Sequence, residues 1–196
     1  MSIHPIEVES YRILEGRVDL PHDPFVAAVI ARTIHATADL DFAESMRVTR
    51  DAVEAGIDAT ASGAPVIVDV EMVRAGITAV DTACYLRDVA VAPDGSTRSA
   101  AAMRIAAERH PEGAIVVVGC APTALVEAVR LVEAGEFAPA LVIGVPVGFV
   151  GAAQSKDLVR LAPVPSITNV GEKGGSAVAA AVLNAIVRLQ PPNGRR

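Results

Sequence analysis

Short runs of aliphatic and β-branched residues alternate with longer helical segments along this chain. The clearest runs are residues 65–70 (PVIVDV), 114–118 (AIVVV) and 141–145 (LVIGV), with weaker candidates at 77–80 and 166–170. Short runs that are apolar on both faces are typical of strands buried in a parallel sheet. Strands that alternate with helices form a sheet with helices on both faces. The sequence therefore predicts an α/β fold with a central, mainly parallel sheet.

Helical segments are predicted between and around these strands. The clearest start is Asp23-Pro24, where Asp suits the N-cap and Pro the first helical position. The predicted helices cover residues 6–14, 24–38, 45–61, 71–75, 97–109, 123–134 and 152–161, and a last helix that opens at 174–176 and runs to about 188. No repeat or linker divides the 196 residues, so we expect a single domain, 1–196, with a frayed tail at 190–196.

The composition excludes several classes of protein. The chain carries 17 Lys and Arg against 23 Asp and Glu, and its aromatic content is 3% with no Trp, so nucleic-acid binding is not expected. The long apolar runs are interrupted by Gly and Pro, and no signal peptide is recognisable, which predicts no membrane span and a cytoplasmic location. Cys84 and Cys120 lack metal-type spacing, and neither a Walker sequence nor GxGxxG follows a strand. We therefore expect no metal and no nucleotide cofactor.

Three glycine-bearing loops follow predicted strands, at residues 119–123, 146–151 and 171–176. Ligands of open parallel sheets bind beyond the carboxyl ends of the strands. Glycines there let backbone N–H groups approach an anion, and a following helix N-terminus favours negative charge. Each loop taken alone fits a tight turn equally well. The three together favour a site for an anionic ligand.

His35 and Arg32 are the candidate reactive and binding residues on the helix at 24–38. Their i,i+3 spacing puts both side chains on one face, where Ala28 and Ala31 leave room for a large, flat ligand. Imidazole titrates near neutral pH, which suits a proton donor. A single helical histidine is also commonly a packed or solvated residue, so spacing alone leaves catalysis and packing as alternatives.

Arg98 stands at the start of the predicted helix 97–109, where a cation is unfavourable for the helix dipole. Contact with a ligand anion would explain this position, and a solvated surface arginine is the alternative. Ser10 carries no signal of its own. Cys120 follows a strand end, but the sequence places no histidine or aspartate to activate it, which favours a small buried residue.

Several longer strings, in order, resemble the precorrin-8X methylmutases, which include the cobalt-precorrin-8 methylmutases. The likeness covers nearly the whole chain. Its marks are residue 6 (I) with 9–13 (ESYRI), 31–39 (ARTIHATAD), 69–70 (DV) with 72–73 (MV) and 76–77 (GI), 97–101 (TRSAA), 121–125 (APTAL), 145–153 (VPVGFVGAA), 155–156 (SK) and 174–179 (GGSAVA). Such a series is far more specific than any single motif above.

The resemblance implies a flavodoxin-like three-layer sandwich and an isomerase of cobalamin biosynthesis. The reaction would move a methyl group from C-11 to C-12 of precorrin-8X, giving hydrogenobyrinate, or of cobalt-precorrin-8, giving cobyrinate. It implies no cofactor, a tetrapyrrole substrate, and a homodimer with sites near the subunit interface. His35 matches the family's proton donor and acceptor, whose protonation of the ring system would promote a sigmatropic methyl shift. Ser10 and Arg32 match substrate contacts, and Arg98 falls in a family motif and is expected to bind a substrate carboxylate.

Two departures from the family pattern keep other functions open. Cys120 stands where relatives usually carry Asn, and residues 171–175 read GEKGG where relatives often show GRRGG. Loss of both arginines weakens carboxylate recognition in that loop. One alternative is a non-catalytic tetrapyrrole or corrinoid carrier. Another is an unrelated α/β enzyme of phosphorylated substrates, against which the missing phosphate motifs count. The matched motifs are shared by the cobalt and cobalt-free branches.

Overall fold

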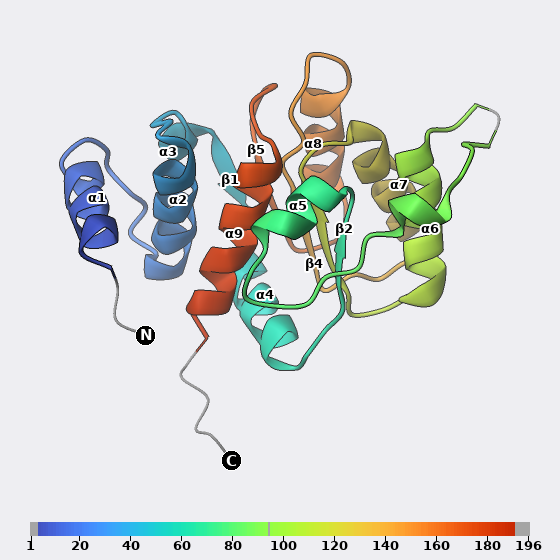
Figure 1. The fold of residues 1–196 in the computed structure, drawn as a ribbon, viewed down its shortest axis with the longest axis horizontal. Helices are drawn as coiled ribbons and strands as arrows, with labels where there is room; N and C mark the ends of the chain where they lie inside the picture. The colour runs from blue at the N-terminus through green and yellow to red at the C-terminus, as the bar shows by residue number, and fades with distance from the viewer. Residues whose placement is uncertain (1–3, 94, 191–196) are drawn as a thin grey trace.

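The fold is a three-layer α/β sandwich, shown in Figure 1. The structure, a computed structural model, describes residues 4–93 and 95–190. Within these residues the sheet has five strands in the order β1-β5-β4-β3-β2, of which β2 to β5 are parallel and β1 is antiparallel to β5. The strands are β1 Met46–Val48, β2 Val66–Val68, β3 Ile115–Val118, β4 Leu141–Gly144 and β5 Ser166–Asn169. The predicted α/β class with a mainly parallel sheet is confirmed.

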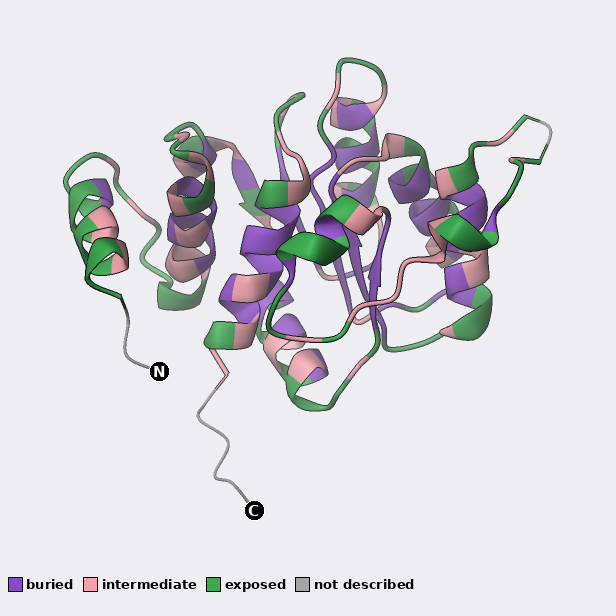
Figure 2. Ribbon diagram, in the orientation of Figure 1, coloured by how far each residue is buried: buried purple, intermediate pink, exposed green. Residues whose placement is uncertain are grey.

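Alternate strand residues face two separate helical layers. Val117 and Ile143 pack against the layer of α2, α4, α5 and α9, whereas Val116 and Val142 pack against α6, α7 and α8. The strands β2 to β5 are buried along their length, as Figure 2 shows, whereas the edge strand β1 exposes Arg47. The helices are α1 Pro5–Glu15, α2 Pro24–Thr37, α3 Phe42–Ser45, α4 Ala52–Ala61, α5 Glu71–Gly76, α6 Arg98–Arg109, α7 Pro122–Glu133, α8 Ala152–Leu161 and α9 Ser176–Arg188, with a 3-10 turn η1 at Tyr85–Asp88.

The outer side of β2 carries one further parallel contact. The Ala83 N–H donates to Val66 O at 2.8 Å, and the Val68 N–H donates to Ala83 O at 2.9 Å. With this bridge counted as a strand, the parallel strands follow the flavodoxin order 2-1-3-4-5, and β1 is an addition at the opposite edge. The predicted strand at 77–80 is therefore wrong. Ile77 is buried directly after α5, and the chain pairs with β2 only at Ala83.

The predicted helix at 45–61 is also partly wrong. α3 ends at Ser45, where the predicted helix begins, the short strand β1 follows, and the helix of this segment is α4 alone. Met46 pairs with Asn169, and Val48 pairs with Ile167. Asp51 takes a left-handed conformation (φ 60°) that separates β1 from α4. Pairing with the edge of the sheet thus outweighs local helix propensity in this segment.

The C-terminal end and the lengths of the helices bear on three further predictions. In the predicted frayed tail at 190–196, residues 191–196 lie outside the described residues, and Gln190 is half-buried just beyond α9. The prediction of a single domain over 1–196 stays a prediction.

Every helix within 4–93 and 95–190 is too short or too polar to cross a bilayer.

A buried carboxylate joins α6 to α7. Glu127 accepts hydrogen bonds from Arg104 Nε at 2.8 Å and from Arg130 Nε at 3.0 Å. Burial alone would raise the pKa of Glu127, but the two guanidinium partners outweigh it, and the pKa lies below its ordinary value. These ion pairs therefore stabilise the fold when the glutamate is ionised.

The lowered pKa of Glu127 makes the stability of the fold depend on pH. Because the folded pKa is lowered, the stabilisation is present above the ordinary glutamate pKa and is lost as the pH falls through the folded value. Glu127→Gln should lower the free energy of unfolding by about 1–3 kcal/mol near neutral pH. The difference from the wild type should shrink at acid pH, below the ordinary pKa of a glutamate. Urea unfolding at both pH values measures it, with the exposed Glu136→Gln as control. An equal difference at both pH values would contradict the assignment.

Gly174 lets the loop before α9 lie directly on the end of β4. Its φ is 152°, and a Cβ at this position would collide with the backbone oxygen of Val145. The same oxygen accepts the N–H of Gly175 at 2.9 Å. Only glycine fits both the backbone conformation and this close approach.

Gly174→Ala is accordingly predicted to destabilise the fold more than a change at a glycine that has only a positive φ. Gly63 provides that control, since its φ is 72° and no atom lies within 4 Å of the position that a Cβ would take there. Gly63→Ala should cost about 1–2 kcal/mol, the penalty of a left-handed conformation. Gly174→Ala should cost roughly 1–3 kcal/mol more, because the collision adds to that penalty. Equal urea midpoints for the two variants would show that the loop can shift to relieve the collision without a cost in stability.

Candidate active site

The helix α1 packs on the face of α2 that carries His35. Ser10 Oγ lies 2.7 Å from His35 Nδ1, within hydrogen-bond distance. The Tyr11 ring stacks on the imidazole, with ring centroids 5.2 Å apart and planes 22° from parallel. Two residues that are 25 positions apart in the sequence, Ser10 and His35, are thus in direct contact. The structure brings these two predicted residues together.

Local signals explain where α2 begins and ends. The Asp23 carboxylate accepts the N–H groups of Phe25 and Val26 at 2.8 and 3.1 Å, so the predicted N-cap is confirmed. The helix ends at Ala38, which takes a left-handed conformation with φ 55°. His35 therefore lies in the last turn of α2.

Arg32 lies one turn before His35 and is held by a carboxylate of α1. Glu7 Oε1 accepts Arg32 Nη1 at 2.7 Å and Arg188 Nη1 at 2.6 Å. The hydrogen bond from Arg188, with the nearby charges of Arg32 and His35, holds the pKa of Glu7 below its ordinary value despite partial burial. Arg32 Nε is buried and has no acceptor among the described residues. The guanidinium therefore retains a donor for a further partner.

The predicted open room beside Ala28 and Ala31 is only partly present. Ala31 is buried, with 7% of its surface exposed, and Ala28 is half-buried. α1 packs against this helix and restricts the space over it. The face that carries Arg32 and His35 is consequently a narrow, part-covered surface.

Arg98 does not join these residues within one chain. It donates from Nε to Val89 O at 2.8 Å and from Nη2 to Leu86 O at 3.0 Å. These carbonyl groups give the cation a partner at the start of α6. In Figure 1, α6 lies at the opposite end of the long axis from α1 and α2.

The first glycine loop is shaped by an internal carboxylate. Asp69, just beyond β2, is 3% exposed and accepts the N–H groups of Gly119, Cys120 and Ala121 at 3.1, 2.8 and 2.7 Å. Burial raises the pKa of Asp69, and the three N–H groups oppose that effect. The N–H groups that suited a ligand anion are thus occupied by the protein itself. Cys120 is half-buried, and its Sγ lies 2.9 Å from Ser176 Oγ.

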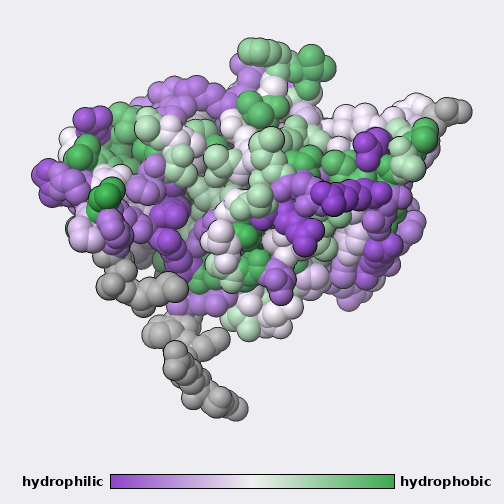
Figure 3. All heavy atoms as spheres, in the orientation of Figure 1, coloured by the Kyte–Doolittle hydropathy of each residue, from purple (hydrophilic) through white to green (hydrophobic). Residues whose placement is uncertain are grey.

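The other two glycine loops leave helix N-termini open. α8 begins after Gly151 and α9 after Gly175, and neither start has a side-chain cap among the described residues. In the loop before α8, Phe149 and Val150 are 91% and 89% exposed. Their loop leads from β4 into α8 at the top of Figure 1, where Figure 3 shows a hydrophobic tip. The carboxyl edge of the sheet thus combines open helix starts with an apolar projection.

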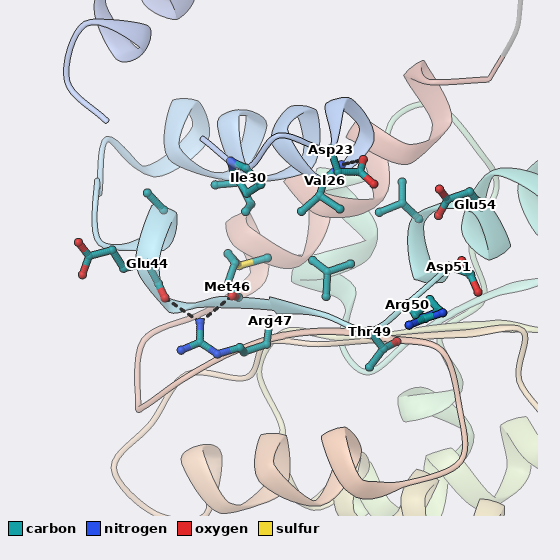
Figure 4. A pocket seen from close by; sticks show the side chains of 14 residues that line it. Asp23, Val26, Ile30, Glu44, Met46, Arg47, Thr49, Arg50, Asp51 and Glu54 are labelled. Atoms are coloured by element: carbon teal, nitrogen blue, oxygen red, sulfur yellow. Dashed lines mark hydrogen bonds between the residues drawn. The ribbon is translucent and has the colours of Figure 1, made fainter. Parts of the chain in front are cut away.

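A hollow of about 420 Å³ lies between α2, β1 and α4, as Figure 4 shows. Val26 and Ile30 line it from the side of α2 opposite to His35. On its floor, Arg47 Nη1 donates to Glu44 O and Met46 O. None of the four predicted site residues lines this hollow, so it is separate from the candidate site.

Glu7 and Tyr11 have no role in the interpretation from sequence, although both contact the predicted residues. Glu7 precedes Ser10 by three positions, as Arg32 precedes His35. This shared i,i+3 spacing could have suggested the pairing only if the packing of α1 on α2 were already known. In the part of the chain that the structure describes, no three His, Cys, Asp or Glu side chains gather as a metal site would require.

Comparisons with known proteins bear on this geometry. A family model described as precorrin-8X methylmutase matches residues 5–189. Cobalt-precorrin-8 methylmutase of Methanocaldococcus jannaschii is 42% identical, over 81% of this chain and 77% of the relative. Precorrin-8X methylmutase of Pseudomonas aeruginosa is 41% identical, over 91% of both chains. The crystal structure of the Thermus thermophilus precorrin-8X methylmutase superposes with a TM-score of 0.85 at 37% identity, covering 94% of each chain.

The family match spans nearly the whole chain, and the solved relative shares its fold over the same extent. The residues of the α1–α2 contact, Ser10, Arg32 and His35, all lie within the matched segment. The chain therefore belongs to the precorrin-8X methylmutase family, isomerases of cobalamin biosynthesis.

Proposed function

We propose that this chain moves a methyl group from C-11 to C-12 of precorrin-8X or cobalt-precorrin-8, giving hydrogenobyrinate or cobyrinate. The observation that carries the proposal is the 2.7 Å contact between Ser10 Oγ and His35 Nδ1, one helical turn from Arg32. The relatives named above are methylmutases of these two tetrapyrroles. Both substrates are therefore candidates for this chain.

In the proposed reaction, Ser10 fixes which ring nitrogen of His35 exchanges the proton. Ser10 Oγ accepts the Nδ1–H of the imidazolium, which leaves Nε2–H as the acid. Transfer of this proton to the tetrapyrrole draws electron density through the conjugated ring and promotes the sigmatropic methyl shift. Nε2 then takes a proton back, so the reaction is a net isomerisation with no oxidant or reductant. Stacking with Tyr11 keeps the imidazole plane in place.

Arg32 supplies the charge that such a substrate needs. The tetrapyrrole is fringed with acetate and propionate groups, which arginine binds through charge-assisted hydrogen bonds. Glu7 occupies Nη1, and the buried Nε has no acceptor among the described residues. A substrate carboxylate would bind the part of the guanidinium that stays accessible, since 20% of the Arg32 side chain is exposed.

The proposed assembly is a homodimer in the cytoplasm with sites near its interface. The exposed side chains of Phe149 and Val150 and of Ile6 on α1 are large apolar surfaces for a single chain to leave in water. Cys84 and Cys120 are both free thiols, which suits a reducing compartment. Since α6 and α2 lie toward opposite ends of the long axis in Figure 1, the proposal has Arg98 contact the substrate at His35 from the second copy.

Substitution of the proposed proton donor tests the chemistry. His35→Ala should reduce kcat by about 10²–10⁴-fold, the usual contribution of a positioned acid or base. Substrate binding should persist because Arg32 remains. Turnover is followed by the absorption change that accompanies corrin formation, with precorrin-8X and cobalt-precorrin-8 tested in parallel. His22→Ala, at an exposed position, is the control.

Each result of this assay has a definite meaning. A wild-type protein that binds either tetrapyrrole tightly without converting it would be the carrier, and the enzymatic proposal would fail. Full activity of His35→Ala would refute the role of this residue. Ser10→Ala should retain binding and lose part of kcat, since it removes only the partner of Nδ1.

Subunit complementation tests the role of Arg98. If Arg98 acts on the substrate held by the other copy, mixed dimers of His35→Ala and Arg98→Ala contain one site with both residues intact. Co-expression of two nearly inactive variants should therefore recover roughly a quarter of the wild-type activity, since about half of the dimers are mixed and each has one good site of two. Sedimentation checks that dimers form. Recovery no greater than the sum of the separate variants would place Arg98 outside the shared site.

A further inference from the structure

The two lysines of the chain hold one loop at Lys173, one through its backbone oxygen and the other through its own side chain. Among the 17 basic residues the only lysines are Lys156 and Lys173, and the other 15 are arginines. Lys156 Nζ donates to the backbone oxygen of Lys173 at 2.7 Å. The side chain of Lys173 then extends to the segment after α2. The loop 171–175, which precedes α9, is thus held from two directions at Lys173.

Lys156 is a buried cation with neutral partners. It projects from α8, is fully buried, and donates to Asn169 Oδ1 at 3.1 Å in addition to Lys173 O. Asn169 Nδ2 donates to the same Lys173 oxygen at 2.8 Å. Burying an ammonium group without a carboxylate is costly, so its retention needs a reason beyond packing. The contacts indicate that the buried ammonium group fixes the position of the Lys173 backbone.

The Lys173 side chain fixes the other side of the loop. Its Nζ lies 2.8 Å from Asp39 Oδ2 and 2.6 Å from Asp41 Oδ2. The hydrogen bond from Lys173 holds the pKa of Asp39 below its ordinary value, which is consistent with a persistent ion pair. Asp39 lies four residues after His35. Lys173 therefore connects the loop to the end of the helix that carries the proton donor.

Backbone contacts complete the restraint. Gly148 N–H donates to Glu172 O at 3.0 Å, and Gly175 N–H donates to Val145 O at 2.9 Å. The loop is thus tied to the end of β4 as well as to α8 and to the segment after α2. Its position is fixed relative to the uncapped N-terminus of α9, which follows it directly.

We infer that Lys156 and Lys173 are positioning residues for substrate binding, which hold the loop 171–175 so that it and His35 border the same tetrapyrrole. This inference rests on the proposed function. In this chain the cation of Lys173 is engaged with two aspartates. The contribution of the loop in this chain is then its shape and backbone rather than its free charge.

The protonation of Lys156 adds a pH dependence to this arrangement. Burial, with a smaller effect from Arg160, lowers the pKa of Lys156 to about 8, and Glu172 opposes the shift. The neutral amine keeps two N–H donors but loses their charge-assisted strength. KM should therefore rise above pH ~8 in the wild type, and Lys156→Met should lack this rise because it has no amine to titrate.

The experiment compares three variants with the wild type. Lys173→Gln removes the ion pairs, Lys156→Met removes the buried donor, and the double variant removes both. Each single change should raise KM about 5- to 50-fold and leave kcat within about twofold, since one to two interactions are lost and the reacting groups are intact. The double variant should be much less impaired than the product of the single effects, because both changes release one loop. Arg74→Gln is the matched control, as Arg74 and Lys173 are both 52% exposed and each pairs with acidic side chains.

A second measurement separates this inference from the proposed function. Amide hydrogen exchange of residues 171–175 without substrate should be faster in each variant and unchanged in Arg74→Gln. If exchange is faster in the variants but the wild type turns over neither tetrapyrrole, the lysines hold the loop as inferred and the proposed function is wrong. Unchanged KM, a loss confined to kcat, or fully multiplicative effects in folded variants would overturn the inference. If Lys156→Met does not fold, the exposed Lys173→Gln decides the question alone.

Discussion

The packing of α9 between the sheet and α2 is the contact on which the candidate site depends. Val178, Val182 and Leu183 of α9 are buried in the same core as the sheet residues Val117 and Ile143. Close approach requires small partners: a Cβ on Gly119 would collide with α9, and one on Gly76 would meet Ala180. α2 lies on the other side of α9, and Arg188 at the end of α9 reaches Glu7. The position of α2, and with it that of His35, is thus fixed relative to the sheet by the packing of α9.

Buried polar groups at the carboxyl edge serve the protein's own loops before any ligand. Asp69 occupies the N–H groups after β3, and Lys156 with Asn169 occupies the carbonyl of Lys173. Each group is expensive to bury, and each is satisfied by backbone atoms of a glycine-containing loop. This arrangement orders the loops through contacts within the protein itself. It also explains why glycine loops alone are a poor guide to an anion site.

Much of the fold could be predicted because its signals are local. α8 begins and ends where the sequence places it, and the buried runs form β2 to β5. β1 could not be predicted because a three-residue strand acquires its identity only by pairing with β5. For the site, the i,i+3 spacing of Arg32 and His35 could be read from one helix. The contact of Ser10 with His35 depends on how α1 packs on α2, which no local pattern encodes, and only family resemblance pointed to Ser10.

The departures from the family pattern have a physical explanation in the contacts that replace them. Cys120 cannot offer the amide of an asparagine, but its thiol meets Ser176 at the start of α9, and its N–H is bound by Asp69. Lys173 is neutralised by two carboxylates, so a substrate carboxylate at this loop would have to compete with Asp39 and Asp41. On the proposed function, the cation left for a substrate carboxylate is Arg32, whose side chain is 20% exposed and pairs with Glu7. On the proposed function, the loop before α9 then contributes its position, and Arg32 at the α1–α2 contact contributes the charge.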